Sequence, residues 1–431
     1  MTAQPYPAIL AGMTETMALR GPDAKGMRLS RHCALGHRRL SVMDPANGAQ
    51  PMTRRKGNAS FTIVYNGELY NAPELRSELA ARGCAFSTSC DTEVLLYAYM
   101  EWGSACVDRL NGIYAFAVWN DEEETLFLAR DRVGVKPLFY ALWNGMFLFG
   151  SEPKAILAYP GFPVEVDREG LAELIAIGPA RTPGHGVYRH MAELKPGHMM
   201  TVDRSGLSIR CYWKLESRTH EDDAETTAKQ VRELLIDTVT RQLVSDVPVC
   251  TLLSGGLDSS ALTAIAADHY RQSGQGAVET YSIDYKDNDK HFKANVFQPN
   301  PDAPWIERMV SYLGTRHHAV QFDTPELVES LLPAMRARDL PGMADVDGSL
   351  YLFCLEIKKG ATVAISGEAA DEVFGGYPWF HREELLNADT FPWSVSRGNL
   401  TRLLTKEAAD WLRPDEYLNQ RYSEALSEVP H

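Results

Sequence analysis

The sequence predicts a chain of two parts, an α+β sandwich followed by an α/β part built on a parallel sheet. Up to about residue 213, short strands come in runs with helices grouped between them, which is typical of an α+β sandwich. Beyond residue 223, strands and helices alternate, which is the βαβ pattern of a parallel sheet. The length of 431 residues also exceeds what one ordinary core needs, so at least two domains are expected.

The composition is that of a globular protein, with 45% hydrophobic and 23% charged residues. The formal net charge of −14 argues against a broad nucleic-acid surface or an anionic membrane partner, although local basic and backbone N–H groups can still hold ATP. Apolar runs such as residues 113–119 are far below the roughly 20 residues of a membrane-spanning helix, and residues 1–5 give no signal-peptide pattern. We therefore expect a cytoplasmic protein.

Seven cysteines are scattered along the chain without a C-x-x-C pair. This pattern favours free thiols in a reducing compartment over a disulfide framework or a zinc site.

The first part combines strands rich in β-branched and aromatic residues with amphipathic helices. Turn residues such as glycine, asparagine and aspartate separate these elements. The predicted strands are residues 61–65, 113–119, 125–130 and 146–151, and the predicted helices are residues 73–82 and 91–102. Runs of strands of this kind predict a sandwich rather than a wound parallel sheet.

A polar segment without apolar periodicity, residues 214–223, is expected to be a linker between domains at residues 1–213 and 224–431. A long amphipathic helix over residues 223–243 should follow it. The predicted strands are then residues 249–253, 279–285, 317–322 and 361–366, and the predicted helices are residues 259–270 and 303–313. Ligands of such a sheet are expected at the carboxyl ends of its strands.

The segment Ser254-Gly255-Gly256-Leu257-Asp258-Ser259-Ser260 lies between a predicted strand and a predicted helix. Its glycines allow a tight turn that presents N–H groups, and the serines and the helix N-terminus add donors and positive potential. Such a turn predicts a cradle for phosphate or pyrophosphate. Asp258 fits this site as a Mg²⁺ ligand, and no Walker A string is present. The alternative is a plain strand–helix turn with a serine cap.

A second segment, Ser366-Gly367-Glu368-Ala369-Ala370-Asp371-Glu372, also follows a predicted strand. Its three carboxylates within five residues would repel one another unless a cation or a reacting group lies between them. A solvated acidic turn is the alternative. The Gly274-Gln275-Gly276 string lacks the context of a dinucleotide loop, so we interpret it as a turn that ends a helix.

Together the two segments resemble the pyrophosphatase loop and the S-G-E-x-x-D-E segment of the asparagine synthetase family. The resemblance implies an α/β parallel-sheet ATP-pyrophosphatase domain, similar to adenine nucleotide α-hydrolases, that activates a carboxylate with ATP. It implies that Asp258 and Asp371 bind Mg²⁺ and that Glu368 supports adenylate formation. The ATP-binding residues that it implies are Leu253, Ser254, Gly255, Gly256, Asp258, Ser259, Ser260, Ile283, Ser366 and Gly367.

The first part carries strings that recur in the same order in N-terminal-nucleophile glutaminases, which are αββα sandwiches. These strings are R-G-P-D at residues 20–23, R-L-S-V-M-D at 39–44, N-G-E-L-Y-N at 66–71, D-T-E at 91–93 and R-D-R-V-G-V-K-P-L at 130–138. Glutamine is a zwitterion, and Arg39 and Asp91 supply a cation and an anion for its two charged groups. The resemblance implies that Asn66 and Gly67 form an oxyanion hole and that Glu68 contacts the substrate. Taken singly, such residues are usually turn or surface residues.

Family members use a cysteine that directly follows the initiator methionine as nucleophile, with its own amine as base. This chain begins Met1-Thr2, and Arg20 follows Thr2 by only 18 positions, where the family has about thirty. We therefore expect that the N-terminal Cys nucleophile is absent, that Thr2 does not replace it, and that the 431 residues alone do not hydrolyse glutamine. The family also continues beyond residues 407–431 with helices that carry a catalytic lysine, so about two-thirds to three-quarters of a full enzyme is expected here.

The implied function is that of a carbon–nitrogen ligase, a glutamine-dependent asparagine synthetase. ATP and Mg²⁺ would adenylate aspartate, and ammonia from glutamine would amidate it, giving asparagine, glutamate, AMP and pyrophosphate. The expected partners are aspartate, glutamine and ATP, and a homodimer stays open. One alternative is a β-lactam or isopeptide-forming synthetase of the same superfamily. Others are a catalytically dead nucleotide-binding remnant and an adenylating enzyme with another acceptor.

Overall fold

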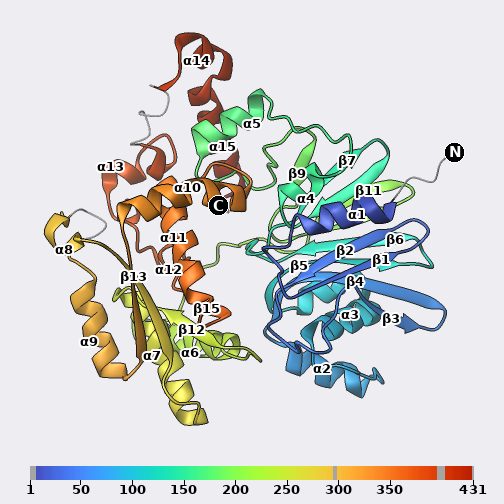
Figure 1. The fold of residues 1–431 in the computed structure, drawn as a ribbon, viewed down its shortest axis with the longest axis horizontal. Coiled ribbons are helices and arrows are strands. Elements are labelled where there is room, and N and C mark those ends of the chain that lie inside the picture. The colour runs from blue at the N-terminus through green and yellow to red at the C-terminus, as the bar shows by residue number, and fades with distance from the viewer. Residues whose placement is uncertain (1–5, 295–298, 396–402, 430–431) are drawn as a thin grey trace. The chain divides into compact units, whose positions relative to one another are not determined.

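The computed structural model describes residues 6–294, 299–395 and 403–429, which form two compact units (Figure 1). Within the described ranges, unit 1 comprises residues up to 174 and 181–217, and unit 2 comprises residues 175–180 and 218–429. Residues 212–223 form neither helix nor strand. The boundary at residues 217 and 218 falls inside the segment predicted as a linker, whereas residues 175–180 of the predicted first domain group with unit 2.

Unit 1 is built on three antiparallel sheets, of orders β11-β10-β6-β5-β4-β3, β8-β7-β9 and β1-β2. The strands are β1 Ala24–Leu29, β2 Ala34–Arg39, β3 Met52–Lys56, β4 Ala59–Leu69, β5 Gly112–Asn120, β6 Thr125–Arg130, β7 Phe139–Trp143, β8 Met146–Gly150, β9 Met191–Glu193, β10 His198–Asp203 and β11 Gly206–Cys211. The helices are α1 Tyr6–Glu15, α2 Ala72–Ala81, α3 Asp91–Trp102, η1 Gly103–Arg109, α4 Pro153–Leu157, α5 Arg168–Ala172 and η2 Glu173–Ile177.

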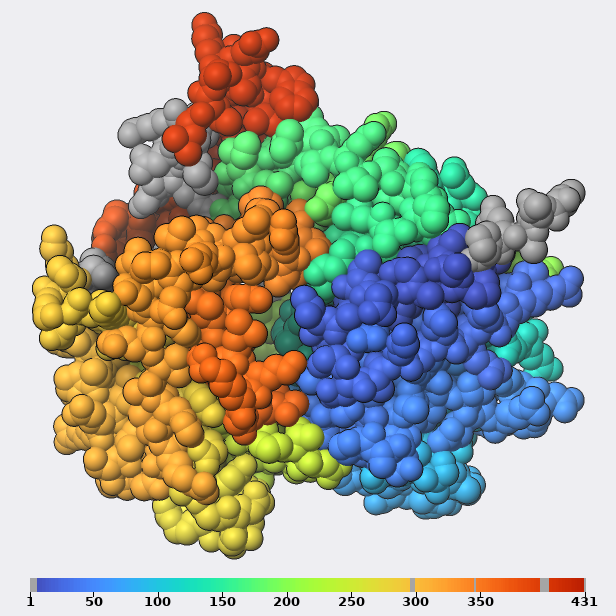
Figure 2. All heavy atoms as spheres, in the orientation of Figure 1, coloured from blue at the N-terminus to red at the C-terminus, as the bar shows by residue number. Residues whose placement is uncertain are grey.

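The six-stranded sheet is buried on both faces because successive side chains of a strand point in opposite directions. In β4, Ile63 joins the core that packs against α2 and α3, whereas Val64 joins the core on the other face. That second core includes Leu35 of β2 and Leu138, so the smaller sheets form a second β layer. Helices α1 and α4 pack on this layer, and α1 and β1 form the dark blue surface of unit 1 in Figure 2. The predicted αββα sandwich is confirmed.

Unit 2 contains a parallel sheet of order β14-β13-β12-β15. The strands are β12 Val249–Leu252, β13 Glu279–Tyr285, β14 Arg316–Phe322 and β15 Val363–Ile365. The helices are α6 Ala224–Gln242, α7 Leu257–Ser273, α8 Asn288–His291, α9 Ala303–Leu313, α10 Thr324–Arg338, α11 Ala344–Ile357, α12 Ala370–Phe374, η3 Pro378–Phe380, α13 Glu383–Leu386, η4 Pro392–Ser394, α14 Lys406–Leu412 and α15 Pro414–Glu428. The predicted parallel sheet is confirmed.

Both faces of this sheet are covered. Residues of α6 and α7 pack with Val249 and Ile365 on one face, and residues of α11 pack with Cys250 and Tyr281 on the other. The chain runs from β12 outward to β13 and β14, and then returns to place β15 on the opposite side of β12. Ligands of open parallel sheets bind beyond the strand ends at such a reversal of strand order.

The predicted strands at 125–130 and 279–285 and the predicted helices at 91–102 and 303–313 have the observed bounds. Gly274 ends α7 in a left-handed conformation, with φ 71°, so the interpretation of Gly274–Gly276 as a helix-terminating turn is confirmed. None of the helices in the described part of the chain has the length and apolarity needed to cross a membrane.

Candidate active site

A cavity of about 670 Å³ lies inside unit 1. Side chains of α1, β2, β4, the start of α3 and the loop before β7 line it. The five residues predicted to bind glutamine, Arg39, Asn66, Gly67, Glu68 and Asp91, all line this unit 1 cavity. The structure therefore brings together residues that are up to 52 positions apart in the sequence.

Arg39 is a buried cation at the end of β2, 7% exposed. Three of its N–H groups donate to the backbone carbonyls of Met43, Asp44 and Pro45, at 2.6, 2.9 and 3.1 Å. No carboxylate of the described residues forms an ion pair with it. A buried charge without a counter-ion is costly, so this guanidinium, which keeps two free N–H donors, is suited to an anionic ligand.

Space under this guanidinium exists because residue 48 is a glycine. A Cβ atom at Gly48 would lie 2.1 Å from Nη2 of Arg39 and 2.9 Å from the sulfur of Cys90. Any larger residue would therefore displace the arginine head.

Asp91 is the first residue of α3 and is also buried, 7% exposed. Its Oδ2 accepts hydrogen bonds from the Tyr65 hydroxyl and the Leu69 backbone N–H, both at 3.0 Å. Burial raises the pKa of Asp91 above its usual value, although these hydrogen bonds act in the opposite direction. No cation of the described residues forms an ion pair with Asp91. Arg39 and Asp91 are thus a buried cation and a buried anion of this cavity, each without an ion pair to the described residues.

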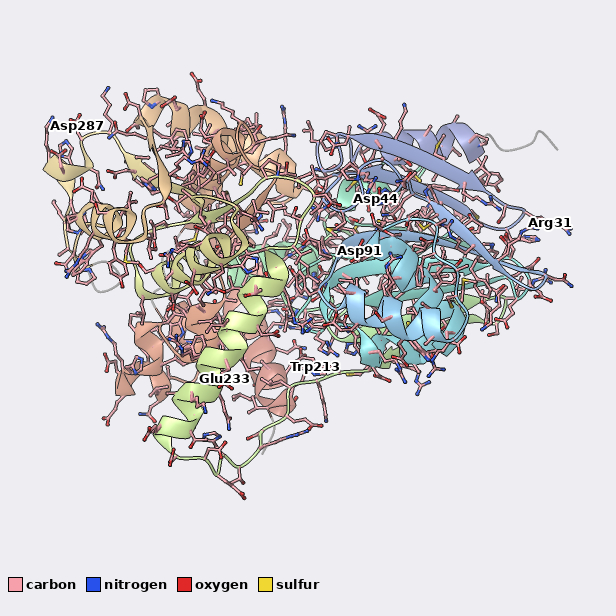
Figure 3. All side chains as sticks on the ribbon, turned by 90° about the horizontal axis from the view of Figure 1, so that it is seen from below. Arg31, Asp44, Asp91, Trp213, Glu233 and Asp287 are labelled. Carbon is pink, nitrogen blue, oxygen red and sulfur yellow. The ribbon has the colours of Figure 1, made fainter. Side chains whose placement is uncertain are left out.

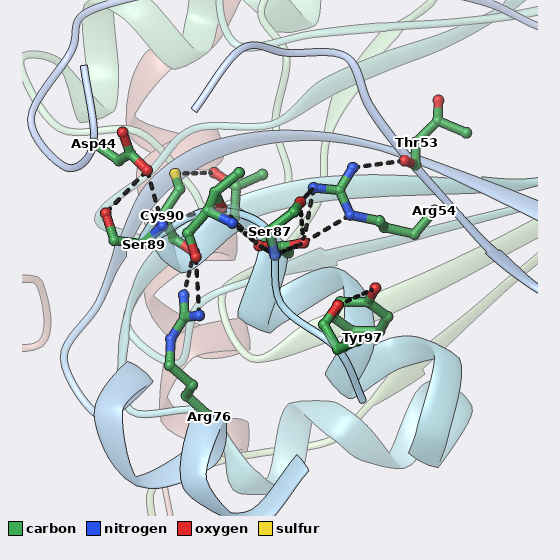
Figure 4. Close-up of polar contacts among 12 residues, drawn as sticks. Asp44, Thr53, Arg54, Arg76, Ser87, Ser89, Cys90 and Tyr97 are labelled. Atoms are coloured by element: carbon green, nitrogen blue, oxygen red, sulfur yellow. Dashed lines mark hydrogen bonds and ion pairs between the residues drawn. The ribbon is translucent and has the colours of Figure 1, made fainter. Parts of the chain in front are cut away.

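The loop that receives Arg39 is held by Asp44 (Figures 3 and 4). Oδ2 of Asp44 accepts from the backbone N–H and hydroxyl of Ser89 at 2.8 and 2.9 Å, and Oδ1 accepts two bonds from Asn47 at 3.0 Å. Burial acts against ionisation, but these bonds outweigh it and lower the pKa of Asp44. Asp44 therefore ties the Arg39 loop to the segment that precedes Asp91.

Glu93, in the first turn of α3, anchors the same segment. Its fully buried carboxylate accepts the backbone and hydroxyl groups of Ser87 and Thr88, at 2.7–3.1 Å, and pairs with Arg54 at 2.8 Å. Burial alone would raise the pKa of Glu93, but these donors hold it below its usual range. The start of α3 is therefore fixed before any ligand arrives.

Asn66 and Gly67 sit in β4 opposite Ala115 and Tyr114 of β5. The Asn66 side-chain nitrogen is buried and has no hydrogen-bond partner among the described residues, and a buried donor of this kind calls for an acceptor. A Cβ at Gly67 would lie 2.2 Å from the carbonyl oxygen of Ile113. Glycine is therefore required for this strand pairing.

Glu68 and Lys136 both line the cavity. Burial raises the pKa of Glu68, Lys136 opposes this shift, and Asp91 adds to it. Lys136 is held by its backbone, because its N–H donates to Asp131 at 2.9 Å and its carbonyl accepts from Arg130 at 2.8 Å. Lys136 belongs to the string at residues 130–138 but is not among the predicted glutamine-binding residues.

In unit 2, the Ser254–Ser260 segment forms the turn between β12 and α7. Gly255 has φ 79°, and a Cβ there would lie 2.7 Å from Cβ of Trp305. The Ser259 hydroxyl contacts both the Ser254 hydroxyl at 3.0 Å and the Gly256 carbonyl at 3.2 Å. These contacts hold the backbone open at the N-terminus of a helix of 17 residues.

The two predicted segments of unit 2 lie side by side, because β15 pairs in parallel with β12. A Cβ at Gly367 would lie 3.3 Å from Cβ of Asp258. Of the other predicted ATP-binding residues, Leu253 is buried just after β12, Ile283 lies in the neighbouring β13, and Ser366 follows β15, where its hydroxyl accepts the Glu368 N–H at 3.2 Å.

Asp258 and Asp371 are close enough to interact. Desolvation and then the charges of Asp258 and Glu372 raise the pKa of Asp371. Within the described ranges, no group of three or more His, Cys, Asp or Glu side chains is arranged to hold a metal. Two carboxylates alone fit Mg²⁺ that completes its shell with phosphate oxygens and water. Ala369, two positions before Asp371, has φ 71°, an unusual and strained conformation for alanine.

Comparisons with known proteins match both parts of the chain. A family model described as a glutamine amidotransferase domain matches residues 2–213, and one described as asparagine synthase matches residues 230–431. The chain is 52% identical over 418 residues to glutamine-hydrolyzing asparagine synthetase 3 of Bacillus subtilis, covering 97% of this chain and 68% of that relative. It is 32% identical to asparagine synthetase 1 of that organism (88% and 57% covered) and 30% identical to asparagine synthetase B of Escherichia coli (86% and 61%).

The fold and these matches define a class of carbon–nitrogen ligase that joins a glutamine amidotransferase unit to an ATP-pyrophosphatase unit. Within this class, the chain belongs to the family of glutamine-hydrolyzing asparagine synthetases. It spans 57–68% of the lengths of the three relatives named above. Thr2, which is predicted not to replace the cysteine nucleophile, lies outside the described residues.

Proposed function

We propose that this chain carries the two binding sites of a glutamine-dependent asparagine synthetase, one in residues 1–213 and one in residues 224–431. Its substrates are then glutamine, aspartate and ATP in the cytoplasm. The observation that carries the glutamine half is the pair of buried, unpaired charges in the unit 1 cavity, Arg39 and Asp91. A zwitterionic amino acid neutralises both at once, whereas a simple anion or cation would leave one uncompensated.

In this site, Arg39 binds the α-carboxylate through the N–H groups that the backbone carbonyls leave free. Asp91, with Glu68, accepts the α-ammonium group. The unpartnered Asn66 nitrogen donates to the side-chain carbonyl as negative charge develops there, with the Gly67 backbone beside it. These residues orient glutamine and stabilise its transition state, and the attacking nucleophile is a separate group.

In unit 2, the turn at Ser254–Ser260 holds the pyrophosphate portion of ATP with backbone and serine donors. Asp258 and Asp371 hold Mg²⁺, which neutralises phosphate charge when bound. Leu253, Ile283, Ser366 and Gly367 surround the adenine and ribose, and Glu368 supports formation of the acyl-adenylate. The support for this arrangement is the pairing of β12 with β15, which places both segments at neighbouring strand ends.

The proposal is tested by supplying ammonium chloride in place of glutamine to the purified chain with MgATP and aspartate. We expect AMP and asparagine to form in equal amounts, measured by mass spectrometry, and more slowly than in a family member that carries the catalytic lysine. AMP without asparagine, in the presence of another carboxylate, would indicate a different acceptor. Binding of MgATP without any AMP would support the nucleotide-binding remnant instead.

Glutamine binding is measured separately by isothermal titration calorimetry of L-glutamine and D-glutamine. We expect saturable binding of the L-isomer only, because the two charges and the Asn66 nitrogen fix three points of contact. Equal binding of both isomers, or of neither, would contradict the assignment of the unit 1 cavity.

A further inference from the structure

Tyr65 has no role in the proposed function, yet it connects two parts of the unit 1 cavity. It lies in the middle of β4, is 4% exposed, and its hydroxyl donates to Oδ2 of Asp91 at 3.0 Å. Its ring passes beneath Gly67, since a Cβ at that glycine would lie 2.8 Å from Cε2 of Tyr65. The contact therefore depends on a residue without a side chain two positions along the strand.

The two oxygens of Asp91 are used unequally. Oδ2 accepts from the Tyr65 hydroxyl and the Leu69 N–H, both at 3.0 Å, whereas the side-chain donor to Oδ1 among the described residues is the Cys90 thiol at 3.5 Å. The backbone N–H of Thr92 also interacts with this carboxylate. A thiol is a weak donor. Oδ1 therefore keeps its capacity to accept a strong donor such as an ammonium group.

Tyr65 is itself held from both sides of its backbone. The buried Gln50 amide oxygen accepts the Tyr65 N–H at 2.7 Å, and the amide nitrogen donates to the Tyr65 carbonyl at 3.1 Å. Because this pair of bonds fixes the strand at residue 65, the phenol oxygen is fixed relative to α3. Pre-organised groups of this kind lose little entropy when a ligand binds.

We propose that Tyr65 is a positioning residue of the glutamine site, whose hydroxyl fixes the carboxylate of Asp91 so that Oδ1 receives the α-ammonium group. This inference rests on the proposed function and adds a residue to it. The hydroxyl also favours the charged form of Asp91, because a donor to a carboxylate stabilises the anion. The other titratable groups around this carboxylate are Glu68, Cys90 and Arg39, with Lys136 beside Glu68.

The test is calorimetric titration of the full chain with L-glutamine between pH 5 and pH 8.5, using Y65F and the matched control Y114F. Tyr114 is equally buried in the neighbouring strand, does not line the cavity, and shares a hydroxyl hydrogen bond with Tyr212 at 3.0 Å. We expect Y65F to bind about tenfold more weakly at neutral pH. The pH at which half of the binding is lost should rise by about one pH unit, because Asp91 protonates more readily. Y114F should follow the unaltered chain.

A second variant keeps every atom of the hydrogen bond. Replacing Tyr65 by 3-fluorotyrosine makes the phenol a stronger donor. The pH at which half of the glutamine binding is lost should therefore fall. Unchanged pH profiles for both variants, with glutamine still bound, would overturn the role of Tyr65 while leaving the proposed function in place. Absence of glutamine binding by the unaltered chain would overturn the glutamine site itself, and Tyr65 with it.

Discussion

The two sites of this chain handle charge in opposite ways. In unit 1, Arg39 and Asp91 are buried, and carbonyls, a phenol and backbone N–H groups hold them in place. In unit 2, Glu368 is exposed, and Asp371 stands beside other carboxylates that raise its pKa. The difference fits the proposed ligands, because a zwitterion needs fixed charges of both signs in a dry pocket, whereas MgATP arrives with its own cation.

The largest expected effect is loss of the buried cation. R39M leaves the methylene stem in place but removes the guanidinium, so binding of L-glutamine should weaken by about 100-fold or more. Calorimetry measures this loss. R82M is the control, because Arg82 pairs with Glu78 and Glu101 at the surface of the same unit. Affinity within threefold of the unaltered chain in R39M would mean that Arg39 does not bind the ligand.

The next effect concerns stability rather than binding. E93Q removes the charge that accepts the donors of Ser87, Thr88 and Arg54, and should lower the free energy of unfolding by about 2–4 kcal/mol. Urea denaturation measures this change, and E78Q, at an exposed ion pair, should change it by less than about 1 kcal/mol.

The lowered pKa of Glu93 also predicts how the free energy of unfolding changes with pH. Because the pKa of Glu93 is lowered in the folded state, its contribution is complete above about pH 4.3 and is lost as the pH falls through the folded value. E93Q should therefore lose less stability on acidification than the unaltered chain. An equal loss in both proteins would show that Glu93 is not ionised in the native state.

A smaller effect is expected for MgATP binding in unit 2. D258N should weaken MgATP binding about tenfold, because one of the two oxygen ligands for Mg²⁺ becomes a neutral amide. Binding of ATP in the presence of EDTA should instead improve or stay the same, since a negative charge near the phosphates is removed. Equilibrium dialysis with labelled ATP measures both. Equal weakening with and without Mg²⁺ would contradict a metal-binding role for Asp258.

The smallest expected effect is that of Lys136. K136M removes the cation that favours ionised Glu68, so L-glutamine binding should weaken about threefold at pH 6 and less at pH 8. K136R should restore it at both pH values. A loss in K136M that is the same at every pH would point to packing rather than to the charge.

Local patterns predicted most of the framework. The helix over 91–102 and the strand over 279–285 were predicted with their observed bounds, because apolar spacing and flanking turn residues define them. The strand β1, which reads Ala24-Lys25-Gly26-Met27-Arg28-Leu29 and is largely exposed, has neither alternation nor burial to reveal it.

The site residues also divide into those that local sequence predicts and those whose role depends on tertiary contacts. Arg39 and Asp91 were predicted because their chemistry suits a zwitterion and their strings resemble known ones. Tyr65 and Gln50 were missed because their roles depend on where β4 meets α3, and Tyr65 and Asp91 are 26 positions apart. The sequence signal for Tyr65 is its position in a predicted strand, two residues before Gly67. This signal indicates a role in the site only when the fold is known.

The pairing of β12 with β15 has a further consequence. Thr251 of β12 and Ile365 of β15 are 114 positions apart, yet they are partners in the parallel ladder. The two strands from which the Ser254–Ser260 and Ser366–Glu372 segments continue are therefore one interstrand distance apart, about 4.8 Å. Strand pairing sets this separation, whatever the length of the chain that connects the two strands. Insertions and deletions between α9 and α11 would therefore leave the two proposed ATP-binding segments at neighbouring strand ends.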